Sequence, residues 1–435
     1  FNLIVQFFYL LFNLVKVDTI LISFGGYHSL LPALFGKIFN KKIFIIVHGT
    51  DCVSFPEINY GNLRNPVMRF FISNTYNLVD KILPVIKFLI KKKSKIIIIS
   101  HVGRPKGIFD KTLSLKPICE NLEKKINKKI KLISTNLYDL RKNKLFLDKN
   151  EDVNFLENIR FYKEEEINDI KFAKHLASLG DLYVNDAFSC SHRQHASVSK
   201  ITEFIPSYAG LQLQSEISAL KKITSEIERP ISCIIGGSKI STKIGLIKNL
   251  TFKLDNLIFV GGMANNILKF KGFEIGKSFK EDNCNDVIEE IFNNANVNSC
   301  KIYYPEDVSI GKNFNSVAQF KKLTEISNED MILDIGPKTI KNINKIVENS
   351  KTIFWNGPAG YFENTNFLNG SSEIAKIIGK RSKDNHVYSV VGGGDTIAVI
   401  NKTTSIDNFN FVSTAGGAFL EYLEGKELPG IKALN

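Results

Sequence analysis

The sequence has few of the features that build metal centres, disulfide networks or membrane spans. Its six cysteines lie far apart and none forms a C-x-x-C pair, which argues against structural zinc and against a disulfide framework. Unpaired thiols fit a reducing cytoplasm. The apolar residues 1–15 are short for a membrane span and are interrupted by Asn2, Gln6 and Asn13. They lack a basic start and a small-residue cleavage site, so a signal peptide is not indicated. We therefore predict a cytoplasmic protein with no membrane partner.

A concentrated basic surface is also missing, although the formal net charge is +13. Such an excess suits nucleic acid, a membrane surface or anionic metabolites. The lysines are scattered, as at Lys91 to Lys93 and at Lys124 and Lys125, and no basic patch is interleaved with aromatic residues. This pattern is typical of solvated helix ends, and no nucleic-acid partner is expected. The 435 residues, 44% of them hydrophobic, are enough for two or three globular domains.

Apolar runs that stop at glycine are the most informative feature of the sequence. They are "IFWNGPAG" at residues 353–360 and "VVGGGD" at residues 390–395. A short apolar run bounded by turn residues predicts a buried parallel strand. Glycine after the strand lets a phosphate approach the backbone, and the next helix offers free N–H groups. Asp395 closes the second run, where a carboxylate could hold Mg²⁺. The repeated arrangement predicts a phosphoryl-transfer enzyme.

A pair of lysines follows a third strand end. The predicted strand at residues 231–235 leads into "GGSKISTKI". The spacing is not that of a P-loop. It still places Lys239 and Lys243 four residues apart at a helix start, where both could reach one phosphate. An ordinary solvated lysine pair is the alternative.

The first eighty residues predict a β-α-β unit, with strands at 19–24 and 42–47 and a helix at 28–39. The polar end at residues 48–51 could hold a sugar or phosphate, or Asp51 could cap the next helix. The stretches "GGYHSLLPALFGKIFNKKIFIIVHGTDCVSFPEINYG" and "LVDKILPV" resemble part of the N-terminal domain of a GT-B glycosyltransferase. No second glycosyltransferase domain follows in this sequence, so sugar transfer by residues 1–82 alone is not expected.

From Leu83 the sequence changes character. A short amphipathic helix is predicted at residues 83–89, then a strand at 96–100 and the loop "HVGRPKG" at 101–107. Arginine at a strand end can bind a carboxylate or phosphate through two N–H groups. Further cationic residues follow later apolar segments: Arg160, His192, Arg193 and His195. Together they suggest a bowl for a small, doubly charged anion, although His195 could instead be a core histidine.

Three motifs in this part resemble the N-terminal domain of phosphoglycerate kinases: "SHVGRPKG", "FLENIRFYKEEE" and "YVNDAFSCSHRQHAS". The resemblance implies a glycolytic kinase that interconverts 3-phosphoglycerate and 1,3-bisphosphoglycerate. It places His101, Arg104, Arg160 and Arg193 at the positions that bind 3-phosphoglycerate.

The second half resembles the same family and implies binding of ATP or ADP with Mg²⁺. The implied catalytic residues are Lys239, Lys243, Gly393 and Gly394. Asp395 is the implied metal ligand, and Glu363 takes the place of the residue that binds ribose. The implied nucleotide-binding residues are Lys239, Lys243, Gly262, Asn356, Glu363, Gly392, Gly393, Gly394, Asp395 and Thr396.

The fold implied is α/β, with two doubly wound parallel-sheet domains joined by a hinge helix, in a monomer. We expect a glycosyltransferase-like fragment that adds an N-terminal β-α-β segment, an incomplete phosphoglycerate-binding domain, the hinge helix, a nucleotide-binding domain, and a C-terminal segment that packs back toward the first kinase domain. Their respective boundaries are 1–82, 83–205, 206–229, 230–412 and 413–435.

The family's opening motif is not found in this sequence. Phosphoglycerate kinases begin with a strand ending in Asp-x-Asn-x-Pro, followed by an arginine, and Asp-x-Asn-x-Pro occurs nowhere here. Counting back from Pro84, the arginine position holds about Leu78. We therefore expect nucleotide binding with severely weakened turnover. A non-catalytic nucleotide-binding remnant and a glycosyltransferase with an appended domain are the alternatives, and a junction near residues 82–84 is either a fusion or a gene-model error.

Overall fold

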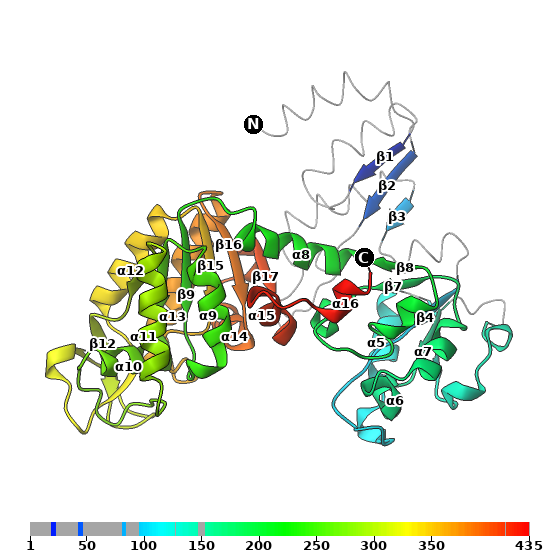
Figure 1. Ribbon diagram of the computed structural model, residues 1–435, viewed down its shortest axis with the longest axis horizontal. Helices are drawn as coiled ribbons and strands as arrows, with labels where there is room; N and C mark the ends of the chain where they lie inside the picture. The colour runs from blue at the N-terminus through cyan, green and yellow to red at the C-terminus, as the bar shows by residue number, and fades with distance from the viewer. Residues whose placement is uncertain are drawn as a thin grey trace. The chain divides into compact units, whose positions relative to one another are not determined.

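The computed structural model describes residues 95–126, 128–146, 153–413 and 415–434, and before them only three strands. It divides into two compact units, residues 1–213 with 429–435, and residues 214–428. Each unit is described by itself (Figure 1).

The three early strands form a parallel sheet in the order β1-β2-β3, made of β1 (Thr19–Ile22), β2 (Lys42–Ile46) and β3 (Lys81–Leu83). The two strands predicted near residues 19 and 42 are therefore present and parallel. The predicted helix at 28–39 and the polar end at 48–51 lie outside the described residues. The prediction of a helix from Leu83 was wrong at its first residue, because Leu83 pairs with Ile46 in the sheet. The rest of that helix lies outside the described residues.

The kinase-like part of the first unit has a second parallel sheet in the order β4-β6-β5. Its strands are β4 (Ile96–Ile98), β5 (Ile130–Ile133) and β6 (Val153–Leu156). The central strand β6 is buried along its whole length, as its apolar sequence requires. Two later strands, β7 (Tyr183–Asn185) and β8 (Ser207–Ala209), form a separate short parallel pair.

Helices α5 (Lys116–Ile126), α6 (Lys163–Glu166) and α7 (Ile170–Ala177) complete this unit. Asp169 caps α7 by accepting the N–H of Phe172 at 2.8 Å. The helix then buries Phe172, Ala173, Leu176 and Ala177, which share one face, in the core that also holds Leu156. The helix α16 (Pro429–Lys432) also belongs to this unit, where the N–H of Gly430 bonds the carbonyl of Ser191 at 2.8 Å.

The predicted hinge helix at 206–229 is shorter in the structure. Its first residues form β8, and the helix α8 spans Leu211–Thr224. The Asp186 carboxylate accepts the N–H groups of Gln212 and Leu213 and so fixes the start of α8.

The second unit is built on a six-stranded parallel sheet in the order β11-β10-β9-β15-β16-β17. The strands are β9 (Ile231–Ile235), β10 (Asn256–Phe259), β11 (Lys301–Tyr303), β15 (Thr352–Asn356), β16 (Tyr388–Gly392) and β17 (Phe411–Ser413). The chain runs outward from β9 to one edge and later outward from β15 to the other. The direction therefore switches between β9 and β15, which are neighbours in the middle of the sheet (Figure 1). Ligands of open α/β sheets bind at the carboxyl ends of the strands at such a point.

Helices cover both faces of this sheet, which is the predicted doubly wound α/β arrangement. Trp355 and Ile353 belong to the core shared with α12, α13 and α14, whereas the ring of Phe354 packs against Phe419 of α15. The helices are α9 (Ile244–Thr251), α10 (Gly261–Phe270), α11 (Asn285–Val297), α12 (Pro337–Asn349), α13 (Asn369–Lys383), α14 (Gly394–Thr403) and α15 (Gly417–Leu423). A smaller antiparallel sheet joins β12 (Asp307–Gly311), β13 (Gln319–Lys322) and β14 (Met331–Ile335).

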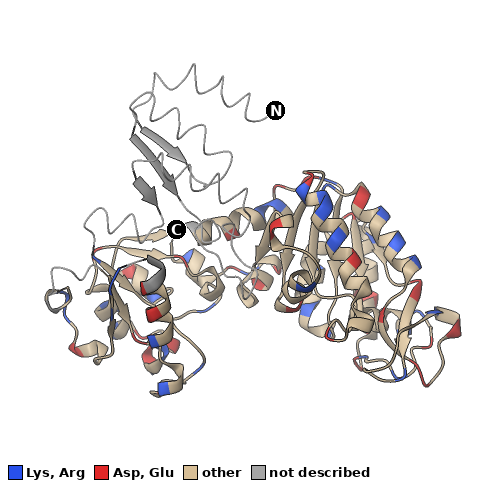
Figure 2. Cartoon of the chain, turned by 180° about the vertical axis from the view of Figure 1, so that it is seen from behind, with Lys and Arg blue, Asp and Glu red and all other residues tan. Residues whose placement is uncertain are grey.

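Charged residues of the described part are mixed in sign along the helices, with acidic residues between the lysines and arginines (Figure 2). Lys91 to Lys93 lie outside the described residues, as do the side chains of Lys124 and Lys125. Among the described residues, no helix combines the length and apolar character that a membrane crossing would need.

Candidate functional site

Two glycine turns meet where the sheet of the second unit switches direction. Gly236 follows β9 and donates its N–H to the carbonyl of Asn356 at 2.9 Å. A Cβ on Gly236 would lie 2.2 Å from the carbonyl oxygen of Pro358, and one on Gly357 would lie 2.3 Å from that of Gly236. Gly357 also has φ +106°. Glycine is thus required at both strand ends because the two backbones approach each other closely.

The third glycine turn opens helix α14. Gly393 has φ +96°, and a Cβ on Gly394 would have no heavy atom within 4 Å. Asp395 is exposed in the first turn of the helix, whose first N–H groups have no partner within the helix. The hydroxyl of Thr396 accepts the N–H of Gly357 at 2.7 Å and so ties the helix start to the neighbouring strand end. This arrangement leaves open space above an array of N–H donors, as an anion site needs.

Lys243 lies at this switch point with its ammonium group largely buried. Its Nζ donates to the carbonyls of Gly236 at 2.6 Å and of Asn356 at 3.2 Å. Burial lowers the pKa of Lys243 to about 8, although the neighbouring Asp395 carboxylate acts in the opposite direction. Lys239 lies before the 3-10 turn Ser241–Lys243 and is exposed. The two lysines are therefore not equivalent members of one helix start.

Asn356 supplies a buried donor beside these cations. Its side-chain Nδ2 has no hydrogen-bond partner among the described residues. A Cβ on Gly393 would lie 3.1 Å from this atom, so the amide is directed at the α14 turn. A buried donor without a partner is costly, and a bound acceptor such as a phosphate oxygen would satisfy it.

The other predicted nucleotide residues occupy different surroundings. Glu363 is exposed. Gly262 packs on the turn after β9, since its Cβ would lie 3.1 Å from Cα of Ser238. Gly392 is required by packing, because its Cβ would lie 2.5 Å from the ring of Phe419.

Asp334 and Lys338 make contacts within the second unit. The Asp334 carboxylate accepts the N–H groups of Gly370 at 2.7 Å and Ile335 at 2.9 Å. Burial raises its pKa to about 7. Lys338 forms an exposed ion pair with Glu306.

Among the described residues of the first unit, Arg160 is the most buried cation, with an exposed fraction of 4%. It lies in the 3-10 turn Ile159–Phe161, which Asn158 caps by accepting the N–H of Arg160. One Nη donates to the carbonyl of Gly103 at 2.9 Å, whereas Nε has no hydrogen-bond partner among the described residues. Burial and then the charge of Arg193 lower the pKa of Arg160. Its Nε lies 3.8 Å from a carboxylate oxygen of Glu166, beyond hydrogen-bond distance.

The protonation states of His101 and His195 differ from those expected of a cationic cluster. Burial, followed by the charges of Arg160 and Arg193, lowers the pKa values of both His101 and His195 to about 4. At neutral pH both imidazoles are uncharged, so the positive charge of this cluster comes from its arginines. The sequence interpretation counted histidines among the cations, whereas burial, and then the charges of Arg160 and Arg193, disfavour a proton on these two rings. His195 is 9% exposed, and its Nδ1 lies 3.6 Å from a carboxylate oxygen of Glu165.

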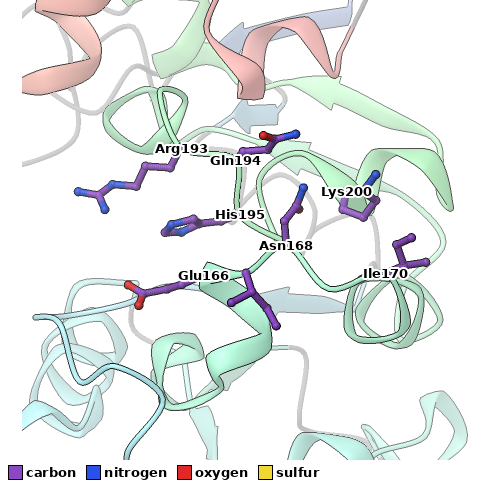
Figure 3. Close-up of a pocket in the computed structure, with 8 residues that line it drawn as sticks. Glu166, Asn168, Ile170, Arg193, Gln194, His195 and Lys200 are labelled. Carbon is purple, nitrogen blue, oxygen red and sulfur yellow. The ribbon is translucent and has the colours of Figure 1, made fainter.

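A hollow of about 640 Å³ opens beside this cluster. In Figure 3 the side chains of Arg193, His195 and Glu166 extend toward the same side, and Lys200 lies away from them. His101, Arg104 and Arg160 do not line it, although the charges of Arg160 and Arg193 both act on His101. Arg104 is exposed. The residues that line the hollow are Glu166, Ile167, Asn168, Ile170, Arg193, Gln194, His195 and Lys200.

Sequence reasoning missed the acidic side of this cluster. Glu165 and Glu166 lie in the run that follows Arg160 and carried no predicted role. The only sequence signal for them was their place immediately after a predicted anion-binding arginine.

Comparison with known proteins agrees with the arrangement of both units. The sequence model of the family described as phosphoglycerate kinase matches residues 68–426, and so begins before Leu83. A phosphoglycerate kinase from Wolbachia pipientis wMel is 47% identical over 354 residues, which are 81% of this chain and 89% of that protein. One from Dictyoglomus turgidum is 44% identical, again with 89% of its length covered. The solved structure of phosphoglycerate kinase from Coxiella burnetii superposes with a TM-score of 0.74 at 32% identity and covers 97% of each chain. The chain belongs to the phosphoglycerate kinase family.

Proposed function

We propose that the chain transfers a phosphoryl group reversibly between ATP and 3-phosphoglycerate, forming ADP and 1,3-bisphosphoglycerate in glycolysis. The observation that carries this proposal is the switch point of the second unit. There a buried amide donor with no hydrogen-bond partner among the described residues, a partly buried lysine and an open helix start surround one position. Chemistry of this kind depends on charge and on donors already in place rather than on a covalent intermediate.

The nucleotide phosphates would bind at the start of α14. Asn356 would donate its free N–H, Lys243 would supply positive charge, and Lys239 is free to reach toward the same phosphates. Gly392, Gly393, Gly394 and Thr396 shape the turn, and Gly262 shapes the neighbouring one. Glu363 would accept hydrogen bonds from the ribose hydroxyls.

Asp395 would hold Mg²⁺ together with the phosphate oxygens. The residues present fit this ion, because Asp395 is exposed in the first turn of α14. In the described part of the chain, no group of three or more His, Cys, Asp or Glu side chains comes together as a metal site. One carboxylate plus phosphate oxygens is a usual environment for Mg²⁺. The ion neutralises phosphate charge when bound.

The acid would bind to the first unit. Arg160 Nε makes no hydrogen bond to the described residues and lies 3.8 Å from a carboxylate oxygen of Glu166, Arg193 faces the hollow, and Arg104 is exposed and can turn toward a ligand. His101 is neutral and would offer a hydrogen bond rather than charge. Two or three guanidinium groups suit a ligand that carries both a carboxylate and a phosphate.

Two experiments separate binding from turnover. Calorimetry should show Mg-ADP and 3-phosphoglycerate binding independently. A coupled assay should show turnover roughly 10³-fold below that of the Wolbachia relative, because the arginine expected near residue 78 is replaced by leucine. Mg-ADP binding without 3-phosphoglycerate binding would instead indicate a nucleotide-binding remnant. Ordinary turnover would refute the predicted weakness.

The glycosyltransferase resemblance of residues 1–82 stays a prediction, as do the cytoplasmic location and the monomeric state. Independent transcript reads across residues 82–84 would show whether the two parts belong to one gene. Heat released on adding a nucleotide-sugar would support the resemblance.

A further inference from the structure

Glu165 is a buried acidic residue inside the cationic cluster of the first unit. It lies in helix α6, which begins directly after the 3-10 turn that carries Arg160. Its exposed fraction is 2%, whereas Glu164 and Glu166 on either side are partly exposed. A carboxylate is rarely buried to this extent without partners.

The hydrogen bonds to its carboxylate come from one other segment. One carboxylate oxygen accepts the N–H of Ser197 at 2.9 Å, and the other accepts the hydroxyl of Ser197 at 2.6 Å. The main-chain carbonyl of Glu165 accepts the N–H of Ala196 at 2.9 Å. The second carboxylate oxygen also lies 3.6 Å from Nδ1 of His195. One residue thus holds the 195–197 turn through three hydrogen bonds.

The two segments joined in this way carry the two arginines of the cluster. Arg160 lies five residues before Glu165, and Arg193 lies four residues before Ser197. Within the described residues, the sheets leave these segments as loops and short turns, so strand pairing does not fix their separation. The contacts of Glu165 supply that restraint.

Glu165 also offsets charge. The negative charges of Glu166 and Glu165 both favour the charged form of Arg160, against burial and the repulsion from Arg193. In turn, burial raises the pKa of Glu165, while the bonds from Ser197 and the charge of Arg160 lower it. Two arginines held near each other repel, so an adjacent carboxylate lowers the cost of keeping both in place before a ligand binds.

We propose that Glu165 is a positioning residue for the 3-phosphoglycerate site, acting through Arg160 and the 193–197 turn. This rests on the function proposed above and adds to it a residue that does not touch the substrate. A well-supported donor set loses less entropy on binding, so the effect should appear in affinity for the acid.

The test compares two substitutions at Glu165 with a matched control. Glu165→Ala removes every side-chain contact, whereas Glu165→Gln keeps one oxygen acceptor. Glu164→Gln removes the same charge one residue away from a partly exposed position. Calorimetry measures the binding affinity of each protein for 3-phosphoglycerate and for Mg-ADP, and circular dichroism checks that each protein is folded.

We expect Glu165→Ala to weaken 3-phosphoglycerate binding about tenfold or more, on the scale seen when outer supporting groups are removed. Glu165→Gln should fall between it and the unaltered protein. Mg-ADP affinity should stay within about twofold throughout, and Glu164→Gln should match the unaltered protein. Ser197→Ala removes one of the same bonds and should weaken acid binding less than Glu165→Ala.

The possible outcomes are distinguishable. If the unaltered protein does not bind 3-phosphoglycerate, the proposed function fails. If it binds, and Glu165→Ala binds equally well, the positioning role is refuted. Equal loss for both ligands would also refute it, since that result indicates a general loss of structure. Should Glu165→Ala not fold, Glu165→Gln and Ser197→Ala decide by the same criteria.

Discussion

Replacing Lys243 with methionine removes a buried ammonium group and keeps a side chain of similar length. Burial lowers the pKa of this lysine from 10.5 to about 8. A shift of this size corresponds to about 3 kcal/mol of destabilisation at neutral pH. The substitution also removes the two hydrogen bonds to the carbonyls of Gly236 and Asn356, each contributing about 1 kcal/mol. The net change in unfolding free energy at pH 7 is therefore small, within about 1 kcal/mol.

The pH dependence is the sharper measurement. Between about pH 8 and 10.5 the unfolded chain keeps the proton on Lys243 and the folded chain releases it. The unfolded state then binds more protons, so stability rises with pH in this window because of this group. At pH 9.5 the unaltered protein should gain about 2 kcal/mol relative to Lys243→Met. Urea unfolding of both proteins at pH 7 and 9.5 measures this difference, since other titrating groups are common to both.

Lys239→Met is the matched control. Lys239 is exposed four residues earlier, so its removal should leave the pH dependence of stability unchanged. Both substitutions should weaken Mg-ADP binding if both lysines reach the phosphates. Parallel stability curves for Lys243→Met and the unaltered protein would refute the reasoning, because the buried charge would then cost nothing.

Three further predictions concern single side chains. Asn356→Ala should weaken Mg-ADP binding about tenfold. The free energy of unfolding in urea should change by less than about 1 kcal/mol, because the deleted donor has no hydrogen-bond partner among the described residues. A larger loss of stability with unchanged binding would contradict this. Arg160→Lys keeps the positive charge but not the planar guanidinium with its several N–H donors. Calorimetry should show at least tenfold weaker 3-phosphoglycerate binding and unchanged Mg-ADP binding. If the variant binds 3-phosphoglycerate as tightly as the unaltered protein, the guanidinium geometry is not used. Burial raises the pKa of Asp334 from 3.8 to about 7, so between these pH values the folded state keeps a proton that the unfolded state loses. The free energy of unfolding should therefore fall by up to about 4 kcal/mol as the pH rises from 3.8 to about 7. Asp334→Asn should remove that fall in urea unfolding experiments, and a fall that persists would belong to another group.

The strand ends were predictable from sequence because their signal is local. An apolar run that stops at glycine marks a buried strand and its turn, and β9, β15 and β16 all end as predicted. The reason for the glycines was only partly predictable. Gly236 and Gly357 are 121 residues apart in the sequence, but their backbones lie so close together that neither position has room for a Cβ. The close approach of the two backbones, rather than a ligand, therefore requires glycine. Only Gly394 leaves the open space that the sequence interpretation gave to all of them.

The charge states were not predictable, because they depend on residues that the fold brings together. His101 and His195 look cationic in a list of residues near arginine. In the structure burial disfavours the proton on both rings, and the charges of Arg160 and Arg193 add to this effect. Lys239 and Lys243 look equivalent by spacing, yet only Lys243 meets the carbonyls of Gly236 and Asn356. Leu83 was assigned to a helix because its pairing with Ile46 is remote in sequence.

Among the described residues, a buried donor without a hydrogen-bond partner lies where each ligand is proposed: Asn356 Nδ2 in one unit and, in the other, Arg160 Nε, which pairs with Glu166 at 3.8 Å. Such a donor costs about 1 to 3 kcal/mol, which a protein of ordinary stability can carry only at a few positions. The same condition also occurs at Ser309 Oγ and Asn154 Nδ2, where no cation or glycine turn was identified. An unsatisfied donor is therefore not a site by itself. It indicates one when, as at Asn356, a buried lysine and an open helix start adjoin it, because these groups favour the same anion that would satisfy the donor.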